Sequence, residues 1–481
     1  MRIEKHPILK FERGREIYFY YNGKKLKAYE GETIASALHA NGIKVLCKSL
    51  RLQRPRGFFC GIGKCSSCLM KVNGIPNVRT CITLVEEGMI VEDNDMELPW
   101  KEYRKCRQEK IEADIAIVGG GPAGLNAAIE ASKYANVLLI DENHKLGGQL
   151  IKQTHKFFGS KEEKAGTRGI EIAKELEKEV NDKENVKILL NTSVIGYYDR
   201  GYHFLAAVNQ LEGILYEIKA KKIIFATGAQ ENMLVFEGND LPGVYGAGGV
   251  QTLMNVYGVK PGNAGLIVGA GNVGLILAYQ LLQAGVEVKA IVEALPKIGG
   301  YFVHAAKVRR CGVPIYTRHS IKKAYGNGRV EGAVVAKLDE KWNFIEGSEM
   351  DIECDFICLA VGLTPSVRLV AQTGAEISFI NEAGGWVALH NEYMETTKEG
   401  IYVAGDLANI EEASTAMIEG KIAGLHAANS IKPVADFEEK IKKYMKELEI
   451  FRQGYFGERP RKAKEEIRRK YYEKVGNRRN S

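Results

Sequence analysis

The pattern of apolar and polar positions changes at about residue 110. Before that point, short apolar-rich runs are separated by Asn22-Gly23 and Asn73-Gly74, pairs that favour two-residue hairpin turns. Between these turns, the stretch TIASALHANGI has apolar residues at helical spacing and a glycine where the helix would end. The pattern predicts a small β-rich module with one helix against its sheet.

After residue 110 the chain follows a different order, in which a strand, a glycine turn, a helix and a strand succeed one another. This order occurs in DIAIVGGGPAGLNAAIEA and again in NAGLIVGAGNVGLILAYQLLQAG. Two βαβ units predict an α/β protein with parallel sheets. From about Phe437 the chain has helical periodicity and high charge, which predicts a helical tail that is either solvated or packed on a partner.

Charge and composition narrow the function classes. The 67 basic and 60 acidic side chains give a net charge of +7, which is a mixed-sign surface and not a field that selects nucleic acid. The N-terminal stretch lacks the apolar core of a signal peptide, and no apolar run is long enough to span a bilayer. We therefore expect a cytoplasmic protein without a transmembrane segment; peripheral association with a membrane stays open. Nine cysteines in such a protein favour metal, cluster or catalytic roles over disulfides.

The first glycine loop has the spacing of a dinucleotide-binding fingerprint. Gly119, Gly121 and Gly124 follow the apolar strand DIAIV directly. One glycine permits the tight turn, one lets the backbone approach a pyrophosphate, and one lets the helix pack on the strand. Asp141 ends the next strand, where a carboxylate binds a ribose hydroxyl. We expect a nucleotide here.

The second loop repeats the arrangement with Gly269, Gly271 and Gly274, and Glu293 ends the following strand. A glutamate there accepts from a free 2′-OH and repels a 2′-phosphate, and no arginine occurs in ALPK directly after it. NAD(H) is therefore expected in preference to NADP(H). The alternative is a degenerate domain that holds ATP or nothing.

Four cysteines follow the spacing of a plant-type ferredoxin. They are Cys60, Cys65, Cys68 and, after twelve residues, Cys81. This pattern is typical of thiolates that hold one [2Fe–2S] cluster. Zinc is the alternative, but zinc knuckles usually present two CxxC pairs and only one such pair occurs here. Of the other cysteines, we expect Cys311, Cys354 and Cys358 to be buried small hydrophobes and assign no role to Cys47 and Cys106.

The order of these motifs resembles the flavoproteins with two dinucleotide-binding domains. Between the glycine loops lies Ala226-Thr227-Gly228, and Gly405-Asp406 follows the second loop. The resemblance, over about residues 112–430, implies FAD at the first loop, with Asp406 on its ribityl–pyrophosphate part, and a second domain inserted in the first. ATP or NAD stays open at that site. The redox CxxC of the disulfide reductases is missing from LGGQLIKQTHKFFG, so disulfide chemistry is not expected.

The stretch RPRGFFCGIGKCSSCLMKVNGIPNVRTC is similar to the N-terminal module of a narrower group. That group comprises the α subunits of dye-linked L-proline dehydrogenase, sarcosine oxidase, opine oxidase and hydrogen cyanide synthase. The domain order is most similar to the archaeal proline dehydrogenases. The resemblance implies an electron-transfer subunit of an amino-acid dehydrogenase that oxidises NADH and passes electrons through FAD to the cluster.

Partners follow from the same resemblance. The amino acid would be oxidised on a β subunit with its own FAD, FMN would lie at the subunit interface, and small iron–sulfur subunits would complete the assembly. Two alternatives stay open. One is an NADH:acceptor oxidoreductase that acts alone, and the other is a non-catalytic subunit that binds a nucleotide as a scaffold.

The expected architecture is an N-terminal β-grasp ferredoxin-like module, two Rossmann-like domains with the second inserted in the first, and a short helical tail. The predicted domains are 1–110 for the [2Fe–2S] module, 111–258 with 385–435 for FAD, 259–384 for NAD(H), and 436–481 for the tail. No catalytic residue is assigned. The predicted cofactor-binding residues are Gly119, Gly121, Pro122, Ala123, Gly124, Asp141, Gly148, Gln149, Thr227, Gly228, Gly405 and Asp406 at the first site, and Gly269, Gly271, Asn272, Gly274 and Glu293 at the second.

Overall fold

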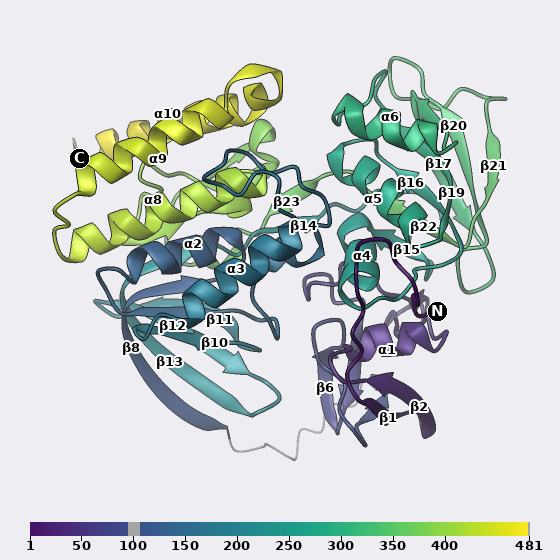
Figure 1. The fold of residues 1–481 in the computed structure, drawn as a ribbon, viewed down its shortest axis with the longest axis horizontal. Coiled ribbons are helices and arrows are strands. Elements are labelled where there is room, and N and C mark those ends of the chain that lie inside the picture. Colours follow the sequence, from purple (N-terminus) through teal and green to yellow (C-terminus); the bar gives the residue numbers. More distant parts are fainter. Residues whose placement is uncertain (95–105, 480–481) are drawn as a thin grey trace. The chain divides into compact units, whose positions relative to one another are not determined.

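The computed structural model describes residues 1–94 and 106–479, which form two compact units (Figure 1). Unit 1 consists of Met1–Lys101 and Glu231–Gly362, and unit 2 consists of Glu102–Gln230 and Leu363–Ser481. The chain leaves unit 2 at β14 (Ala229–Glu231) and returns to it at β23 (Leu363–Pro365). Each unit is therefore built from two separate stretches of sequence.

The first part of unit 1 is the predicted β-rich module. A five-stranded sheet has the order β2-β1-β7-β5-β6, and helix α1 (Ile34–Ala40) begins at a Thr33 capping box and ends before Gly42. Both predicted hairpins are confirmed, because Asn22, Gly23, Asn73 and Gly74 all have positive φ. The strands are β1 (Glu16–Tyr21), β2 (Lys24–Tyr29), β5 (Leu69–Val72), β6 (Ile75–Arg79) and β7 (Ile90–Glu92), with a short pair β3 (Cys47–Lys48) and β4 (Pro55–Arg56) beside them.

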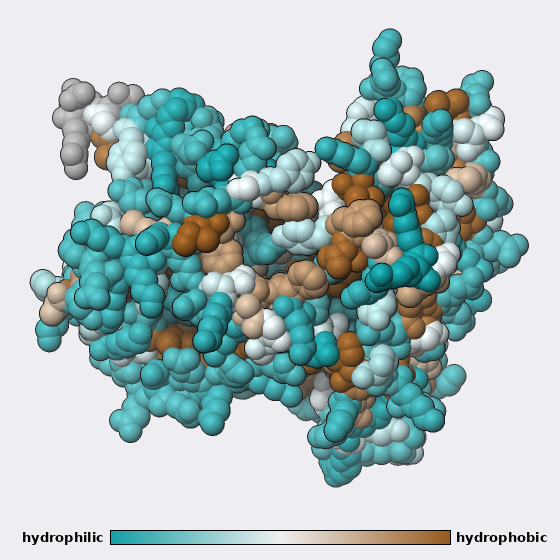
Figure 2. Space-filling model, turned by 45° about the horizontal axis from the view of Figure 1, so that its top comes forward, coloured by the Kyte–Doolittle hydropathy of each residue, from teal (hydrophilic) through white to brown (hydrophobic). Residues whose placement is uncertain are grey.

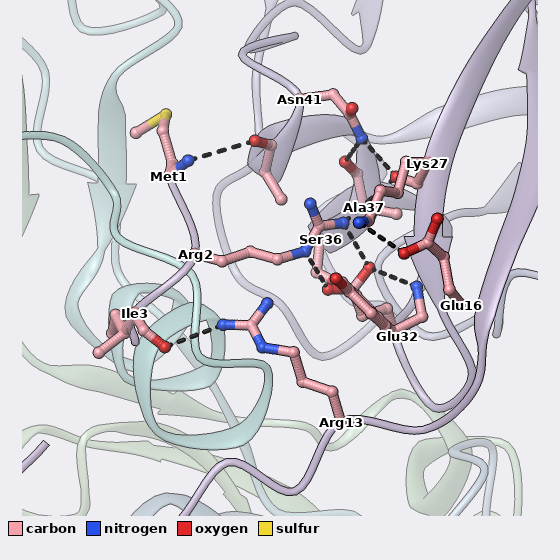
Figure 3. Close-up of polar contacts among 12 residues, drawn as sticks. Met1, Arg2, Ile3, Arg13, Glu16, Lys27, Glu32, Ser36, Ala37 and Asn41 are labelled. Atoms are coloured by element: carbon pink, nitrogen blue, oxygen red, sulfur yellow. Dashed lines mark hydrogen bonds and ion pairs between the residues drawn. The ribbon is translucent and has the colours of Figure 1, made fainter. Parts of the chain in front are cut away.

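The N-terminal segment is bound across this module (Figure 3). Arg2 donates to both carboxylate oxygens of Glu32, at 2.7 and 2.8 Å. Arg13 Nη2 donates to the Ile3 carbonyl at 2.8 Å, and the Ile3 N–H donates to Gly258 O at 2.6 Å. These contacts connect the module to the second stretch of unit 1.

The second stretch of unit 1 contains a parallel sheet of order β15-β22-β16-β17-β18, with a three-stranded sheet β19-β20-β21 beside it. The unit boundaries at Glu231 and Gly362 differ from the predicted domain boundaries at 259 and 384. The difference arises because β15 pairs with β22 of this sheet. The elements are β15 (Val244–Gly246), α4 (Ala247–Gln251), η2 (Thr252–Val256), β16 (Ala264–Val268), α5 (Asn272–Gln283), β17 (Glu287–Glu293), α6 (Phe302–Arg310), β18 (Ile315–Thr317), β19 (His319–Tyr325), β20 (Gly332–Lys337), β21 (Met350–Glu353) and β22 (Phe356–Leu359).

Unit 2 is organised around a seven-stranded sheet of order β10-β9-β8-β13-β12-β11, with β26 paired to β13. Strand β26 comes from the second stretch of unit 2, so the strands of this sheet are separated in the sequence by the second stretch of unit 1. Helices α2 and α8 pack closely, since a Cβ on Gly420 would lie 2.1 Å from Ala123 O. The elements are β8 (Arg107–Val118), α2 (Pro122–Ala131), β9 (Val137–Ile140), η1 (Gly148–Lys152), α3 (Gly169–Asn181), β10 (Val186–Leu189), β11 (Ser193–Asp199), β12 (His203–Asn209), β13 (Ile214–Phe225), α7 (Arg368–Ala371), β24 (Ile377–Ile380), η3 (Asn381–Ala383), β25 (Gly385–Ala388), β26 (Ile401–Val403), η4 (Gly405–Leu407) and α8 (Ala413–Ile431).

The C-terminal residues form α9 (Phe437–Phe451) and α10 (Gly454–Arg479), as the periodicity predicts. These helices are not a solvated tail. Ile441 and Leu448 of α9 join the main core of unit 2, and Ala463 and Ile467 of α10 form a second core with β24, η3 and β25. In Figure 2 the visible surface is mostly hydrophilic, with hydrophobic residues in small patches. In the described part of the chain, no helix combines the length and the apolar character needed to cross a bilayer.

Candidate functional site

The four predicted cluster ligands are brought together in unit 1. Their thiols hydrogen-bond in three pairs, Cys60 with Cys65, Cys60 with Cys81, and Cys68 with Cys81. Three of the cysteines are buried, and Cys65 is half-buried. The hydrogen bonds from Cys65 and Cys81 hold the pKa of Cys60 well below the ordinary thiol value. The hydrogen bond with Cys81 also lowers the pKa of Cys68. Four convergent sulfurs, two of which favour the thiolate, are a donor set that suits an iron–sulfur cluster or zinc.

The backbone around these cysteines favours negative charge on the sulfurs. The N–H groups of Ile62 and Lys64 donate to Cys60, and this contact requires the loop to turn tightly between them. Gly61 and Gly63 make the turn possible with φ of 65° and 73°, a region in which side chains are strained. Hydrogen bonds to the sulfurs tune a cluster held by thiolates.

Helix α4 packs against the cysteine loop at Phe59. The Gly246 N–H donates to Phe59 O at 3.2 Å. A Cβ on Gly249 would lie 2.0 Å from the same oxygen, so only glycine permits this approach. The covering element was not predicted from the sequence; its signal is the run of small residues in YGAGGVQ.

The remaining cysteines differ in environment. Cys354 and Cys358 are buried as predicted, but Cys311 is exposed, so the prediction of a buried hydrophobe is wrong there. It is the first residue after α6, on the solvent side of the helix end. Cys47 lies near Cys68, and its thiol donates to Ser67 O at 3.3 Å. Burial raises the pKa of Cys47 to about 11, so it stays a neutral thiol.

The first glycine loop connects β8 to α2 in unit 2. Gly119 has φ of 110°, and a Cβ on it would lie 2.3 Å from Ala226 O. A Cβ on Gly124 would lie 1.8 Å from Gly119 O. A Cβ on Gly121, in contrast, would meet only Gly148 Cα, at 3.8 Å. The first and third glycines therefore serve the turn and the helix packing, and the second leaves space for a ligand.

Other predicted residues lie around this loop. Gly148 is in contact with Gly121, since a Cβ on Gly148 would lie 2.7 Å from Gly121 Cα, and the adjacent Gln149 is exposed. Thr227 Oγ1 donates to Ser366 O at 3.1 Å, and Gly228 has φ of 64°.

Gly405 and Asp406 form the short helix η4, which lies against the start of α2. A Cβ on Gly405 would be 3.0 Å from the Ala123 Cβ. Burial raises the pKa of Asp406 to about 7, and the charges of Glu411 and Glu419 add to the shift. The structure thus places Asp406 beside the first glycine loop.

The second glycine loop, in unit 1, has the same construction. A Cβ on Gly269 would lie 2.3 Å from Ala360 O, and one on Gly274 would lie 2.1 Å from Gly269 O. A Cβ on Gly271 would meet nothing within 4 Å. Asn272 opens α5 and accepts the Tyr301 N–H at 2.8 Å.

The two strand-end acids have equivalent hydrogen bonds. Asp141 accepts the Gly120 N–H at 2.6 Å, and Glu293 accepts the Ala270 N–H at 2.7 Å. Asp141 also accepts two hydrogen bonds from Asn143, and Glu293 accepts one from the Leu295 N–H. Each carboxylate thereby lies at its own glycine loop, and these bonds leave at least one lone-pair position on each for a ribose hydroxyl. The structure also brings Arg318 near Glu293, since the Arg318 N–H donates to Leu295 O at 3.0 Å. Arg318 lies outside the stretch ALPK that directly follows Glu293 in the sequence.

Both loops fit a dinucleotide. Helices α2 and α5 have glycine N-caps without a side-chain hydrogen bond. Pro122 opens α2 and has no N–H, so α2 offers a phosphate the N–H groups of the residues after it, and α5 offers those of its first turn. The space at Gly121 and Gly271 is where a pyrophosphate approaches the backbone in this fold.

Comparison with known proteins places these sites in a family. Residues 113–420 match the pyridine nucleotide-disulphide oxidoreductase family, and residues 14–95 match the 2Fe-2S iron-sulfur cluster binding domain. The alpha subunit of sarcosine oxidase from Corynebacterium sp. (strain P-1) is 27% identical over 458 residues, which cover 89% of this chain and 45% of that protein. An opine oxidase subunit from Agrobacterium tumefaciens (strain Ach5) is 28% identical over 67% of this chain and 66% of that protein. The chain spans less than half the length of the sarcosine oxidase subunits that it matches.

Solved structures agree with these matches. L-proline dehydrogenase from P. horikoshii has a TM-score of 0.70 and 29% identity, covering 91% of this chain and 79% of that chain. Thioredoxin reductase from T. acidophilum, at 22% identity over 66% of this chain and 99% of that chain, shares the fold with a TM-score of 0.55. These relatives confirm the resemblance to the sarcosine oxidase, opine oxidase and proline dehydrogenase group. Because the first family match covers more than half of the sequence, the chain belongs to the pyridine nucleotide-disulphide oxidoreductase family, with a 2Fe-2S iron-sulfur cluster binding domain before it.

Proposed function

We propose that this chain is the electron-transferring, nucleotide-binding subunit of a multi-subunit amino-acid dehydrogenase of the L-proline type. The observation that carries the proposal is the presence in one chain of a four-thiol site and two dinucleotide loops. When bound, a flavin exchanges the electron pair of a hydride donor for the single electrons that a [2Fe–2S] cluster takes up. Relatives named as a proline dehydrogenase and as the alpha subunit of sarcosine oxidase support this proposal.

Each group has its proposed residues. The four cysteines would hold the cluster. The first loop, with Asp141 and Asp406, would hold FAD, with ATP or NAD as the alternative, and Thr227, Gly228, Gly148 and Gln149 complete that site. The second loop, with Glu293, would hold NAD(H), because its carboxylate accepts from a ribose 2′-OH. The chain itself supplies orientation through backbone N–H groups at α2 and α5.

The amino acid would be oxidised on a partner. We propose an FAD-containing β subunit for that step, with FMN at the interface and small iron–sulfur subunits to complete the assembly. The sarcosine oxidase and opine oxidase relatives are both named as single subunits of their enzymes, which supports a multi-subunit assembly.

An anaerobic NADH titration of the chain, produced alone with iron and monitored by visible absorbance and EPR, tests the proposal. Flavin bleaching followed by a rhombic [2Fe–2S] signal is the expected result. A cluster that only dithionite reduces, in a chain without flavin, would contradict NADH oxidation and leave a nucleotide-binding scaffold. Rapid turnover of NADH with an artificial acceptor, but no gain in L-proline oxidation when candidate partners are added, would favour an oxidoreductase that acts alone.

A further inference from the structure

A buried ionic network lies where α8, α9 and α10 of unit 2 meet. Arg452 Nη2 is 2.8 Å from Glu411 Oε1 and 2.6 Å from Glu419 Oε1, and Lys464 Nζ is 2.7 Å from the same Glu419 oxygen. The four side chains are between 2% and 8% exposed. Burying charge is costly even when the charges are paired, so such a network contributes little net stability. Its position suggests a more specific role.

Both carboxylate residues hold the Gly405–Asp406 turn directly. Glu419 Oε2 accepts the Gly405 N–H at 3.0 Å. The backbone of Glu411 hydrogen-bonds the Asp406 carboxylate. Gly405 is thus bound to Glu419, and Asp406 is bound to Glu411. The side chains of these two glutamates pair with Arg452 and Lys464 from the C-terminal helices.

Lys464 is fixed from a second side by a histidine. Its Nζ is 3.1 Å from His390 Nε2, and His390 Nδ1 is 2.9 Å from Ala388 O. Nδ1–H donates to the Ala388 carbonyl, which leaves the unprotonated Nε2 to accept from the ammonium group. Burial, with the charge of Lys464 adding to it, holds the pKa of His390 well below its ordinary value. Burial lowers the pKa of Lys464, and the Glu419 carboxylate beside it opposes that shift. With His390 neutral, the positive charge of this pair belongs to Lys464, and its position is set by two acceptors.

We propose that Lys464 and Arg452 are positioning residues of the first nucleotide site: by holding Glu419 and Glu411, they keep the Gly405–Asp406 turn in place for the nucleotide. They also balance two carboxylates that would otherwise repel Asp406 and an anionic pyrophosphate. The inference rests on the proposed function, because it requires a nucleotide at the first loop. It makes the C-terminal helices part of this site.

The test is FAD binding by the full chain, measured by quenching of FAD fluorescence, with the thermal midpoint of each nucleotide-free protein as a check on folding. Lys464→Met leaves Arg452 as the ion-pair partner of Glu419 and Glu411 among the described residues, with the charge of Arg468 acting on Glu419 from further away. We expect FAD to bind about tenfold more weakly, or about 1.4 kcal/mol. Glu419→Gln with Lys464→Met removes one charge of each sign and keeps an acceptor for Gly405, so we expect most of the affinity to return. Lys462→Met changes an exposed cation on the same helix that pairs with Glu458; it is the control and should bind like wild type.

If these residues act only through packing, a different pattern is expected. The loss of FAD affinity in the double variant would then equal the sum of the losses in the two single variants. That result, or unchanged FAD binding by Lys464→Met, would overturn the inference. If Lys464→Met does not fold, the double variant decides: near wild-type affinity supports the inference and about a tenfold loss overturns it. A wild-type chain that binds none of FAD, ATP and NAD⁺ would overturn the proposed function as well. If ATP or NAD⁺ binds instead of FAD, the same variants are compared with that nucleotide.

Discussion

Gly249 of α4 lies directly against the carbonyl oxygen of Phe59, the residue before Cys60. A Cβ at position 249 would be 2.0 Å from that oxygen, closer than any real contact. The glycine lets a helix from the second stretch of unit 1 cover the cysteine loop of the first, so the thiol site depends on two distant parts of the chain.

Gly249→Ala should therefore loosen the cysteine loop. Overpacking of this kind typically costs roughly 1–3 kcal/mol in the free energy of unfolding, and we expect lower iron content per chain after reconstitution. Gly476→Ala is the control, because a Cβ there meets nothing within 4 Å and alanine suits a helix. Full iron loading and an unchanged thermal midpoint in Gly249→Ala would contradict the role of α4.

The metal content of the wild type distinguishes a cluster from zinc, and Cys65→Ser tests whether Cys65 is a ligand. In the wild type we expect about two iron atoms per chain and the visible absorbance of a [2Fe–2S] cluster. The serine variant should lose both, since one of four thiolate ligands is gone. Cys106→Ser changes an exposed cysteine outside the site and should keep both signals. Stoichiometric zinc with no iron in the wild type would refute the cluster assignment.

Gly121→Ala and Gly271→Ala form a matched pair for the two nucleotide loops. Neither Cβ would clash with the folded chain, so the thermal midpoints should stay close to that of the wild type. Each methyl group would occupy the space where a pyrophosphate approaches. We expect Gly121→Ala to weaken binding of FAD about tenfold or more and Gly271→Ala to do the same for NADH, as measured by equilibrium titration. Loss of both ligands in one variant would show that the sites are not independent.

Asp406→Asn tests the pKa of the buried carboxyl. The folded-state pKa of Asp406 is about 7, above the unfolded value of about 3.9. The folded chain therefore binds more protons, so Asp406 contributes stability at acid pH that is lost as the pH rises from about 4 to about 7. Urea unfolding without nucleotide gives the free energy of unfolding of each protein. The value for the wild type minus the value for Asp406→Asn should decrease as the pH rises across this range. Asp199→Asn, at an exposed ion pair, should leave the slope between about pH 5 and 7 unchanged. A difference independent of pH would refute the raised pKa.

The sequence alone determined the features that depend on short-range geometry. The Asn22-Gly23 and Asn73-Gly74 turns, the two βαβ loops and the cysteine spacing all follow from residues within a few positions of one another, because turn conformation and ligand spacing are local properties. The inserted second domain came from the resemblance to the flavoproteins with two dinucleotide-binding domains, and the pairing of β26 with β13 agrees with it.

Only the tertiary structure decided which distant residues these segments pack against. Helical periodicity identified an apolar face in residues 437–451, but not that Ile441 and Leu448 join the core of unit 2. Lys464 reads as one more cation in a charged stretch, and its burial follows only because Glu419 and His390 lie opposite it. The same holds for Gly249, whose partner Phe59 is distant in the sequence. A charge or a glycine is given its role by the groups that packing brings within a few ångströms, and that information is not local.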